Sequence, residues 1–400
     1  MGVSDDLRLG RARDLIFSTA EMDAAANLCI ANMTYGLAKI HMVQESLGHP
    51  PDACFVGTPD MTITRNSGRW RAGIGYGGKL SWGDGNRDLL VMDVKPNTCG
   101  MLVGGLKERP DVVELTGRLH ELHRSDLELD GVPIKWDFGT GNHFIDIYET
   151  AETFTTADLP RYMFVIHASG AELRGESAHG PGLYWDDSES WERRYQIVET
   201  PWGSMHILQG DDLAEYMRVY WRTDDFAIRR REMAARELFG DITVIANVNH
   251  QGLANPNVIL LGCQSTVTEP GALLPIMVRA DRPAFLMEGL PNLTLDKARE
   301  LGFEERAESA GVLDRLLNAN VMPHGAGYSL PHLSTVRRVI EIDGTRYFEL
   351  ERLNQRDTQI ISDPKDLTCG YRDEAVVERT VECGMGRIAA RLEPLFVLKS

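Results

Sequence analysis

The chain has 400 residues, of which 43% are hydrophobic and 25% charged, and its formal net charge is −17 at pH 7. This composition is that of an ordinary globular protein, long enough for a large core and without an apolar run of about 18 residues that could span a bilayer. The negative charge disfavours broad, non-specific attraction to nucleic acid, so we expect no DNA partner and no membrane partner.

The first residues, MGVSDDLRLGRARDLIF, lack the basic-then-apolar order of a secretory signal, so we expect a cytoplasmic protein. The six cysteines show no paired spacing and are interpreted as reduced thiols. No internal repeat and no long linker rich in Pro, Gly or Ser divides the chain. We therefore expect one large domain over residues 1–400.

Apolar runs rich in Val and Ile predict strands buried on both faces. In chain order, these predicted strands are residues 88–94, 142–149, 161–168, 241–248 and 257–262. Apolar residues at helical spacing predict helices between and after the strands. The predicted helices are the segment before Gly240 with Leu213, Tyr216, Met217 and Tyr220, then residues 309–320 and 374–395. Helices interleaved with buried strands predict an α/β or mixed α+β fold.

Potential metal ligands lie at the ends of these predicted strands, where a side chain can face a cleft. They are Cys99, His143, His167 and His250. Thiolate and imidazole together suit manganese, zinc, iron or cobalt, and ligands scattered among strands are typical of catalytic sites. Taken singly, each histidine is more often a hydrogen-bonded structural residue, and a lone cysteine more often a small buried apolar residue.

Five sequence blocks resemble the RNA-splicing ligase RtcB family in order and approximate spacing. They are GTGNHFIDIYE (139–149), FVIHASG (164–170), VNHQGLA (248–254), HGAG (324–327) and VVERTVECGMGRIAARLEPLFVLKS (376–400). The NHF and HGAG blocks and the tail are the specific parts, because a short pattern of His and Gly alone matches many proteins by chance. The resemblance covers residues 91–400 and leaves residues 1–90 as a divergent part of an RtcB-like catalytic domain.

The resemblance implies a site for two metal ions, usually manganese, at the ends of the buried strands. Cys99 matches the cysteine that bridges the ions. The histidines that match the remaining ligands are His143, His167 and His250. Asp93 is a further ligand if the loop before Cys99 differs from the family's loop, since Pro96 stands at the usual aspartate position.

The resemblance also implies a site for GTP. His324 matches the histidine that takes GMP from GTP, and Asn142 matches an asparagine that contacts the nucleotide. Tyr371 matches a tyrosine that stacks on guanine, and Lys399 matches a lysine that contacts the base. The implied partners are GTP and RNA ends, such as those of tRNA halves.

The HGAG block has two interpretations. A nucleophilic histidine needs a slim, rigid backbone to approach a phosphorus atom, and Gly325 and Gly327 beside His324 permit this approach. GMP would pass from His324 to an RNA 3′-phosphate, formed where necessary from a 2′,3′-cyclic phosphate, and a 5′-hydroxyl would displace it. The alternative is a tight glycine turn that caps the predicted helix over residues 309–320.

Departures from the family pattern cluster around the nucleotide. Tyr328 follows HGAG where the family has arginine, so the guanidinium that could donate two hydrogen bonds to a phosphate is missing. Gln264 replaces a lysine, and residues 278–285 replace the phosphate or ribose loop, where Arg279 and Arg282 could restore charge. Upstream, only PDM (59–61) and IGYGG (74–78) resemble the family's PDxHxGYG block.

Three functions remain open at this stage. The first is a metal-dependent RNA ligase that uses GTP through a histidine–GMP intermediate. The second is a manganese-dependent phosphoesterase or nucleotidyltransferase on the same scaffold, with altered nucleotide use. The third is a non-catalytic relative that binds RNA ends or a partner protein.

Overall fold

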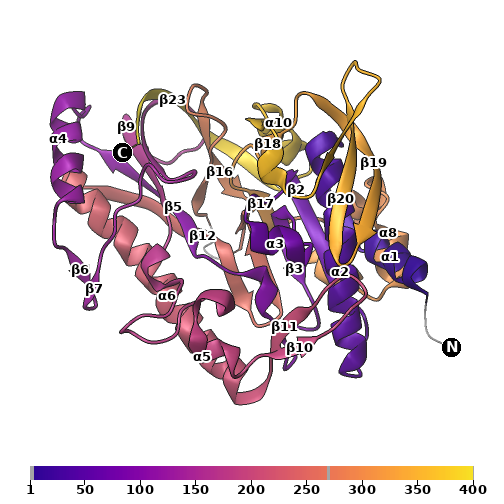
Figure 1. The fold of residues 1–400 in the computed structure, drawn as a ribbon. Coiled ribbons are helices and arrows are strands. Elements are labelled where there is room, and N and C mark those ends of the chain that lie inside the picture. The colour runs from indigo at the N-terminus through magenta and orange to yellow at the C-terminus, as the bar shows by residue number, and fades with distance from the viewer. Residues whose placement is uncertain (1–3, 268–270, 400) are drawn as a thin grey trace.

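The structure is a computed structural model that describes residues 4–267 and 271–399 (Figure 1). Its fold is mixed α+β, as predicted, and is built around a large central sheet. The α-helices of the described residues are α1 (Asp5–Asp14), α2 (Ala24–Ser46), α3 (Ser67–Ala72), α4 (Val112–His123), α5 (Glu189–Glu192), α6 (Gly210–Phe239), α7 (Leu295–Glu300), α8 (Glu304–Ser309), α9 (Leu313–Leu317) and α10 (Ala375–Glu382). Within the described residues, we find no helix with both the length and the apolar character needed to cross a bilayer.

The central sheet has eleven strands, and only the β1–β2 pair among them is parallel. In sheet order the strands are β1 (Ile16–Ser18), β2 (Cys54–Thr62), β3 (Tyr76–Ser81), β13 (Val258–Leu261), β12 (Thr243–Asn255), β5 (Cys99–Leu106), β9 (Tyr162–Ala168), β8 (Phe144–Thr153), β23 (Gly386–Leu398), β16 (Ala284–Gly289) and β15 (Leu273–Ile276). Several neighbouring strands come from distant parts of the sequence, such as β5 beside β12 and β8 beside β23.

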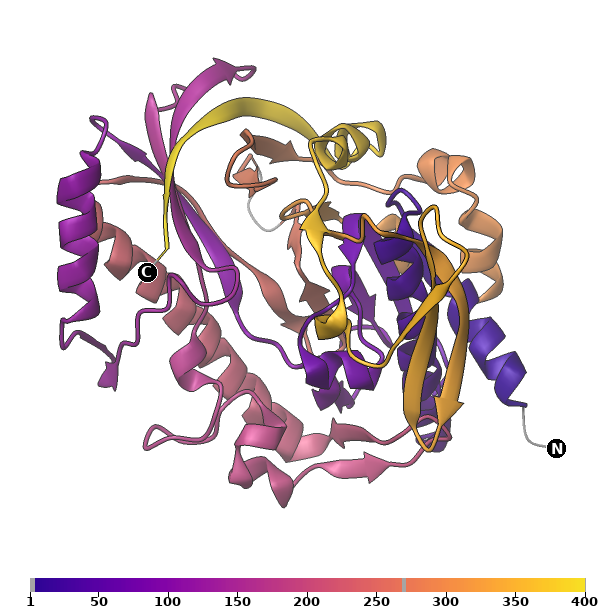
Figure 2. The ribbon, with the colours of Figure 1, turned by 45° about the horizontal axis from the view of Figure 1, so that its top comes forward.

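Smaller sheets surround the central one. They are β10 (Gln196–Val198), β11 (Met205–Leu208) and β4 (Leu90–Val91); β14 (Cys263–Ser265) with β17 (Val321–Pro323); β18 (Tyr328–Ser329) with β22 (Gly370–Tyr371); β19 (Leu333–Ile342), β20 (Thr345–Arg352) and β21 (Thr358–Ile361); and β6 (Glu128–Leu129) with β7 (Val132–Pro133). Figure 2 shows β19 and β20 as a long pair beside α2, at the opposite side of the molecule from α4.

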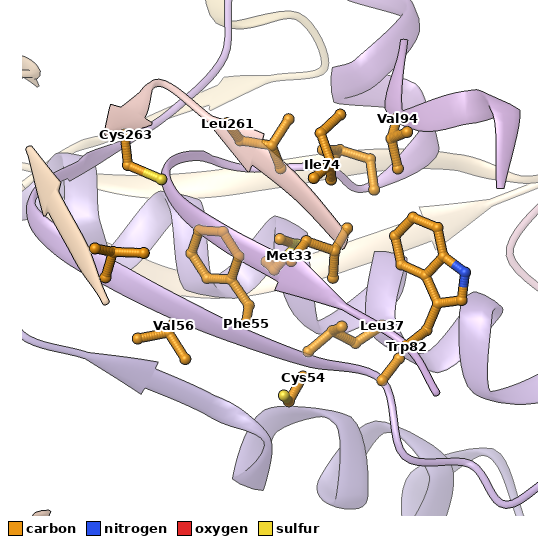
Figure 3. Close-up of a cluster of buried hydrophobic side chains, with 14 of the residues drawn as sticks. Met33, Leu37, Cys54, Phe55, Val56, Ile74, Trp82, Val94, Leu261 and Cys263 are labelled. Atoms are coloured by element: carbon orange, nitrogen blue, oxygen red, sulfur yellow. The ribbon is translucent and has the colours of Figure 1, made fainter. Parts of the chain in front are cut away.

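Two long helices cover different parts of the central sheet. The apolar stripe of α6 contacts β12, β5 and β9, and the helix also packs on α4 (Figures 1 and 2). The helix α2 begins at Asp23, whose side chain accepts a hydrogen bond from the Ala26 amide at 2.8 Å, and it packs against β2. A dense cluster of buried side chains lies between α2 and the strands β2, β3 and β13, including Met33, Phe55 and Trp82 (Figure 3).

Two predicted elements were wrong in part. The predicted helix over 374–395 ends after α10, because Gly384 adopts a φ of 68°, and the remainder forms β23 between β8 and β16. The predicted strand over 88–94 is only the two-residue β4 followed by a 3₁₀ turn over Met92–Val94, and Lys95 then turns the chain with a φ of 45°.

The predicted helix over 309–320 is shorter than expected. Gly311, with a φ of 68°, separates α8 from α9, and β17 follows before His324. The HGAG block is therefore not a cap on that helix. The predicted burial of strands on both faces holds for β9, whereas β12 begins with exposed Thr243 and Val244. The fully buried strand β5 was not predicted.

A close backbone contact joins α2 to the turn after α3, and we predict that it tolerates no side chain. A Cβ added at Gly36 would lie 2.1 Å from the Gly73 carbonyl oxygen, so Gly36→Ala should lower the free energy of unfolding by about 1–3 kcal/mol. The matched control is Gly117→Ala in α4, where no atom lies within 4 Å of the new Cβ. This control should gain about 0.5–1 kcal/mol, since alanine favours a helix over glycine. Urea denaturation measures both; equal stabilities would contradict the packing described.

Candidate functional site

The register of four adjacent strands brings the cysteine and three histidines together. Cys99 opens β5 opposite Gln251 of β12, and His167 of β9 lies opposite both Met101 of β5 and Phe144 of β8. His143 immediately precedes Phe144. His250 was predicted at a strand end but lies within β12, where a β-bulge between Asn249 and Gln251 redirects its side chain.

The side chains of Cys99, His143, His167 and His250 converge in the interior. The Cys99 Sγ lies 3.0 Å from the His167 Nε2 and 3.6 Å from the His143 Nε2, and the Nε2 atoms of His167 and His250 are 3.2 Å apart. Cys99, His167 and His250 are buried and offer three ligand atoms within 4.8 Å of one another, so this group could hold a metal ion.

Hydrogen bonds to the far side of two rings fix which nitrogen faces the group. The His167 Nδ1–H donates to the Asn142 carbonyl oxygen at 2.8 Å, and the His143 Nδ1–H donates to the Asp137 carboxylate at 2.7 Å. These bonds leave the Nε2 atoms directed at the Cys99 sulfur. Such outward hydrogen bonds orient metal-binding histidines and make them more basic. The residues present therefore fit a divalent ion with sulfur and nitrogen ligands.

Burial and mutual contact shift the protonation of these groups. Burial alone would raise the pKa of the Cys99 thiol, but His167, His143 and His250 around it hold that pKa well below its ordinary value. Burial lowers the pKa of His250 to about 3, so that ring is neutral. Burial opposes protonation of His143 as well, yet Asp137 and Cys99 raise the pKa of His143 to about 9. Binding of an ion by the His143 ring would thus release a proton.

A fully buried arginine, Arg230, binds the carboxylate that holds the His143 ring. Arg230 of α6 donates through Nη2 to Asp137 at 2.9 Å and through Nε to Glu172 at 2.8 Å. Although burial opposes it, His143 and Arg230 hold the pKa of Asp137 below its ordinary value, so the carboxylate stays charged. Arg230 therefore acts as a positioning residue that fixes the His143 ring through Asp137.

His324 lies beside the group of ligands. Its ring centroid is 4.3 Å from that of His250. Its Nδ1–H donates to the buried carboxylate of Asp60 at 3.0 Å, and Asp60 in turn accepts a hydrogen bond from the Thr58 hydroxyl at 2.6 Å. The hydrogen bond to Asp60 uses the Nδ1 of His324 and not its Nε2.

The glycines after His324 have steric reasons to be glycine. Gly327 adopts a φ of 69°, and a Cβ there would lie 2.2 Å from the Asp60 carbonyl oxygen. A Cβ at Gly325 would lie 3.0 Å from the Met277 carbonyl oxygen. The absence of a side chain at Gly327 thus allows Asp60 of β2 to lie close enough to hydrogen-bond the His324 ring.

A cavity of about 590 Å³ opens over these residues, within the range of small-molecule sites. Cys99, His143, His167 and His324 line it, together with the predicted nucleotide residues Asn142, Tyr371 and Lys399. Tyr371 is half exposed and its ring lies 5.3 Å from that of Tyr328, centroid to centroid. The cavity therefore joins Cys99, His143, His167, the His324 imidazole and an aromatic surface in one space.

The cavity wall carries more positive than negative side chains in this acidic protein. Its cations are Arg65, Arg69, Arg174, Arg279 and Lys399, and its carboxylates are Asp137, Asp146 and Asp281. The Asp281 carboxylate is bound by Arg279. Burial raises the pKa of Asp146 to about 7, which reduces its negative charge near neutral pH. Such a wall attracts anions.

Asp93, which we predicted as a further ligand, lies elsewhere. Its carboxylate accepts hydrogen bonds from the His206 backbone amide at 2.6 Å and from the His206 Nδ1–H at 3.1 Å. Asp93 does not line the cavity and is not part of the group of ligand atoms. The turn at Lys95 and a φ of 53° at Thr98 lead the chain away from Asp93 before Cys99 begins β5.

Three residues of the site were not predicted from the sequence: Asp60, Asp137 and Arg230. Asp60 belongs to the PDM block at 59–61, which was noticed as similar to the family but received no role. Asp137 precedes His143 by six residues, and Arg230 lies within an arginine run on α6; neither carried a spacing signal. Only the tertiary structure shows that these residues support the two histidines.

Comparison with known proteins gives no assignment for the chain. No protein-family model matches the sequence, and no curated protein matches it significantly.

We predict that Cys99→Ala removes high-affinity binding of Co²⁺, because the thiolate is shared by the imidazoles around it. Cobalt titration should show a thiolate-to-metal charge-transfer band in the unsubstituted protein and no such band in the variant. The matched control is Cys54→Ala, a buried thiol whose sulfur contacts the Ser81 hydroxyl instead. A charge-transfer band that survives in Cys99→Ala would rule out this sulfur as a ligand.

We also predict that Asp137→Asn weakens Co²⁺ binding by about 10–100-fold, the usual effect of removing the carboxylate behind a ligating histidine. Isothermal titration calorimetry measures the loss. Asp241→Asn, an exposed carboxylate paired with Lys107, serves as the control and should bind Co²⁺ normally. Equal affinities in the two variants would mean that His143 does not ligate the ion.

Proposed function

We propose that the protein is a metal-dependent, RtcB-like RNA ligase that joins an RNA 3′-phosphate or 2′,3′-cyclic phosphate end to a 5′-hydroxyl end. The observation that carries the proposal is the position of His324. Its Nδ1 is held by the buried Asp60, its ring lies 4.3 Å from that of His250, and it lines the same cavity as Cys99. The resemblance of the HGAG and NHF blocks to the RtcB family supports the same assignment.

His324 has the features of a nucleophile for phosphoryl transfer. Asp60 keeps the Nδ1 protonated, so the Nε2 lone pair is available to attack, and the carboxylate stabilises the positive charge that develops on the ring. A divalent ion held by Cys99, His167 and His250 would supply charge neutralisation for phosphate oxygens beside that ring. Asp60 and Thr58 hold the ring in position before the substrate binds.

The proposed reaction has three steps. The His324 Nε2 attacks the α-phosphorus of GTP, an N–P bond forms, and the bond to the departing pyrophosphate breaks. An oxygen of the RNA 3′-phosphate then attacks the same phosphorus, which frees His324 and leaves an RNA end activated by GMP. Finally the 5′-hydroxyl of a second RNA end attacks the 3′-phosphorus, GMP leaves with its phosphate oxygen, and the hydroxyl proton passes to solvent.

The cavity wall suits these substrates. Tyr371 offers a half-exposed ring on which a base can stack, and Lys399 and Asn142 line the same cavity. The buried Asp146 lines the same cavity and has one carboxyl oxygen without a hydrogen-bond partner among the described residues. The excess of cations over carboxylates favours polyanions such as RNA ends and triphosphates.

Two observations favour a similar enzyme that uses a nucleotide other than GTP. Tyr328 places an aromatic ring against Tyr371 where the family has an arginine. The Gln264 amide nitrogen donates to the carbonyl oxygens of Pro275 and Pro323 and therefore does not contact a phosphate. The second candidate is a metal-dependent nucleotidyltransferase or phosphoesterase with altered nucleotide use.

The test is covalent labelling of the protein with manganese and α-³²P-GTP. The unsubstituted protein should form an acid-labile adduct, and His324→Ala should form none, because the attacking nitrogen is gone. Asp60→Asn should slow adduct formation by about 100-fold or more, since the amide no longer fixes the ring or stabilises its charge. His332→Ala, at an exposed histidine, provides the control and should label normally.

Two other results would identify a different function, and a third would refute the role of His324. Labelling by α-³²P-ATP but not by GTP, again lost in His324→Ala, would identify a nucleotidyltransferase with altered nucleotide use. Hydrolysis of a 2′,3′-cyclic phosphate without any protein adduct would identify the phosphoesterase. Adduct formation that persists in His324→Ala would refute the assigned nucleophile.

A further inference from the structure

Arg69 is a buried cation at the wall of the cavity. It lies on the short helix α3, is 3% exposed, and lines the same cavity as Cys99 and His324. Its Nε atom is buried and has no hydrogen-bond partner among the described residues. A buried guanidinium with an unsatisfied donor is costly, and the cost is offset when an anion binds.

No carboxylate among the described residues forms an ion pair with Arg69, whereas Arg230 pairs with Asp137 and Glu172. Arg231 and Arg346 are also buried without a carboxylate, but neither lines the cavity. The three guanidinium nitrogens of Arg231 all donate to amide or carbonyl oxygens, and Arg346 donates to Asn32 and to backbone carbonyls. Arg69 therefore differs from them in facing a space that a ligand can enter.

The neighbours of Arg69 place it beside the reactive residues. The side-chain amide of Gln251 lies against the terminal nitrogens of Arg69 and the Tyr76 hydroxyl, and the amide orientation that satisfies both directs the oxygen at Arg69 and the nitrogen at Tyr76. Gln251 follows His250 in β12, and the Tyr76 ring lies 5.6 Å from the His324 ring, centroid to centroid. Arg69 and His324 thus flank Tyr76, and among the described residues the Arg69 guanidinium has the neutral amide of Gln251 as its side-chain partner and no carboxylate.

We propose that Arg69 binds a phosphoryl group of the substrate between α3 and His324, and so supplies the guanidinium that Tyr328 does not provide. This inference rests on the proposed function for the identity of the substrate, but binding of the anion itself does not require that function. A guanidinium is well suited to this role because its planar fork donates two hydrogen bonds to phosphate oxygens. The exposed Arg65 lines the same cavity and adds positive charge at its mouth.

The experiment compares Arg69→Gln with Arg71→Gln, which removes the same charge from an exposed residue of the same helix. The probe is inorganic phosphate, added without metal or nucleotide, and the readout is the shift in melting temperature with phosphate concentration. Arg69→Gln should raise the dissociation constant for phosphate at least about tenfold, as expected for loss of a charged hydrogen bond. Arg71→Gln should stay within about twofold of the unsubstituted protein.

The melting temperatures without phosphate separate binding from folding. Arg69→Gln should melt no lower than Arg71→Gln, because the removed charge has no carboxylate partner. If Arg69→Gln fails to fold, Arg69→Lys decides: weaker phosphate binding at an unchanged melting temperature supports the proposal, and unchanged binding overturns it. Equal phosphate affinities in the two glutamine variants, or no stabilisation of the unsubstituted protein by phosphate, also overturn it.

Two further measurements distinguish whether Arg69 binds the triphosphate of GTP or the 3′-phosphate of the RNA end. Loss of the GTP adduct in Arg69→Gln, with normal binding of a 3′-phosphorylated dinucleotide, assigns Arg69 to the triphosphate. Normal adduct formation with weakened dinucleotide binding assigns it to the RNA end. Weakened phosphate binding in Arg69→Gln of a protein that forms no adduct would uphold Arg69 as an anion site and refute the ligase.

Discussion

The hydrogen-bonded register of β12, β5, β9 and β8 determines whether a site exists at all. Sliding β9 by one residue against β5 would move His167 to the opposite face of the sheet, away from Cys99. The neighbouring strands also fix Gln251 opposite Cys99, and the bulge beside it aims His250 at the sulfur. Backbone pairing thus sets the positions of ligands that are up to 151 residues apart, from Cys99 to His250.

The polar groups behind these ligands make the arrangement rigid. Asp137 is held between His143 and Arg230, and Asp60 is held between His324 and Thr58. Each of these carboxylates is hydrogen-bonded on both sides, and the pKa of Asp137 is lowered by His143 and Arg230. The rings of His143 and His324 are therefore presented to the cavity in fixed orientations before any ligand binds, which reduces the reorganisation that binding requires.

The sequence was informative where local pattern and tertiary position coincide. His167 could be placed near a strand end because an apolar run marks its strand, and the HGAG block marked His324. Cys99 was placed after the predicted strand over 88–94, whereas it begins β5, which was not predicted. The role of Asp93 could not be predicted, because it depends on two residues with positive φ that are not glycine, Lys95 and Thr98. Asp60 and Arg69 could not be assigned either, since their importance arises from contacts with residues about 180 to 264 positions away.

The location of β23 in the interior of the sheet has a consequence for how the molecule assembles. This strand comes from the last fifteen residues of the sequence, yet it lies between β8 and β16, and β16 and β15 join the sheet only through it. During synthesis on the ribosome, one edge of β8 stays unpaired until β23 has emerged, and β23 begins 233 residues after β8 ends, from Thr153 to Gly386. An exposed edge of that kind is prone to pair with other chains, so we expect nascent molecules to depend on chaperones more than the finished fold would indicate.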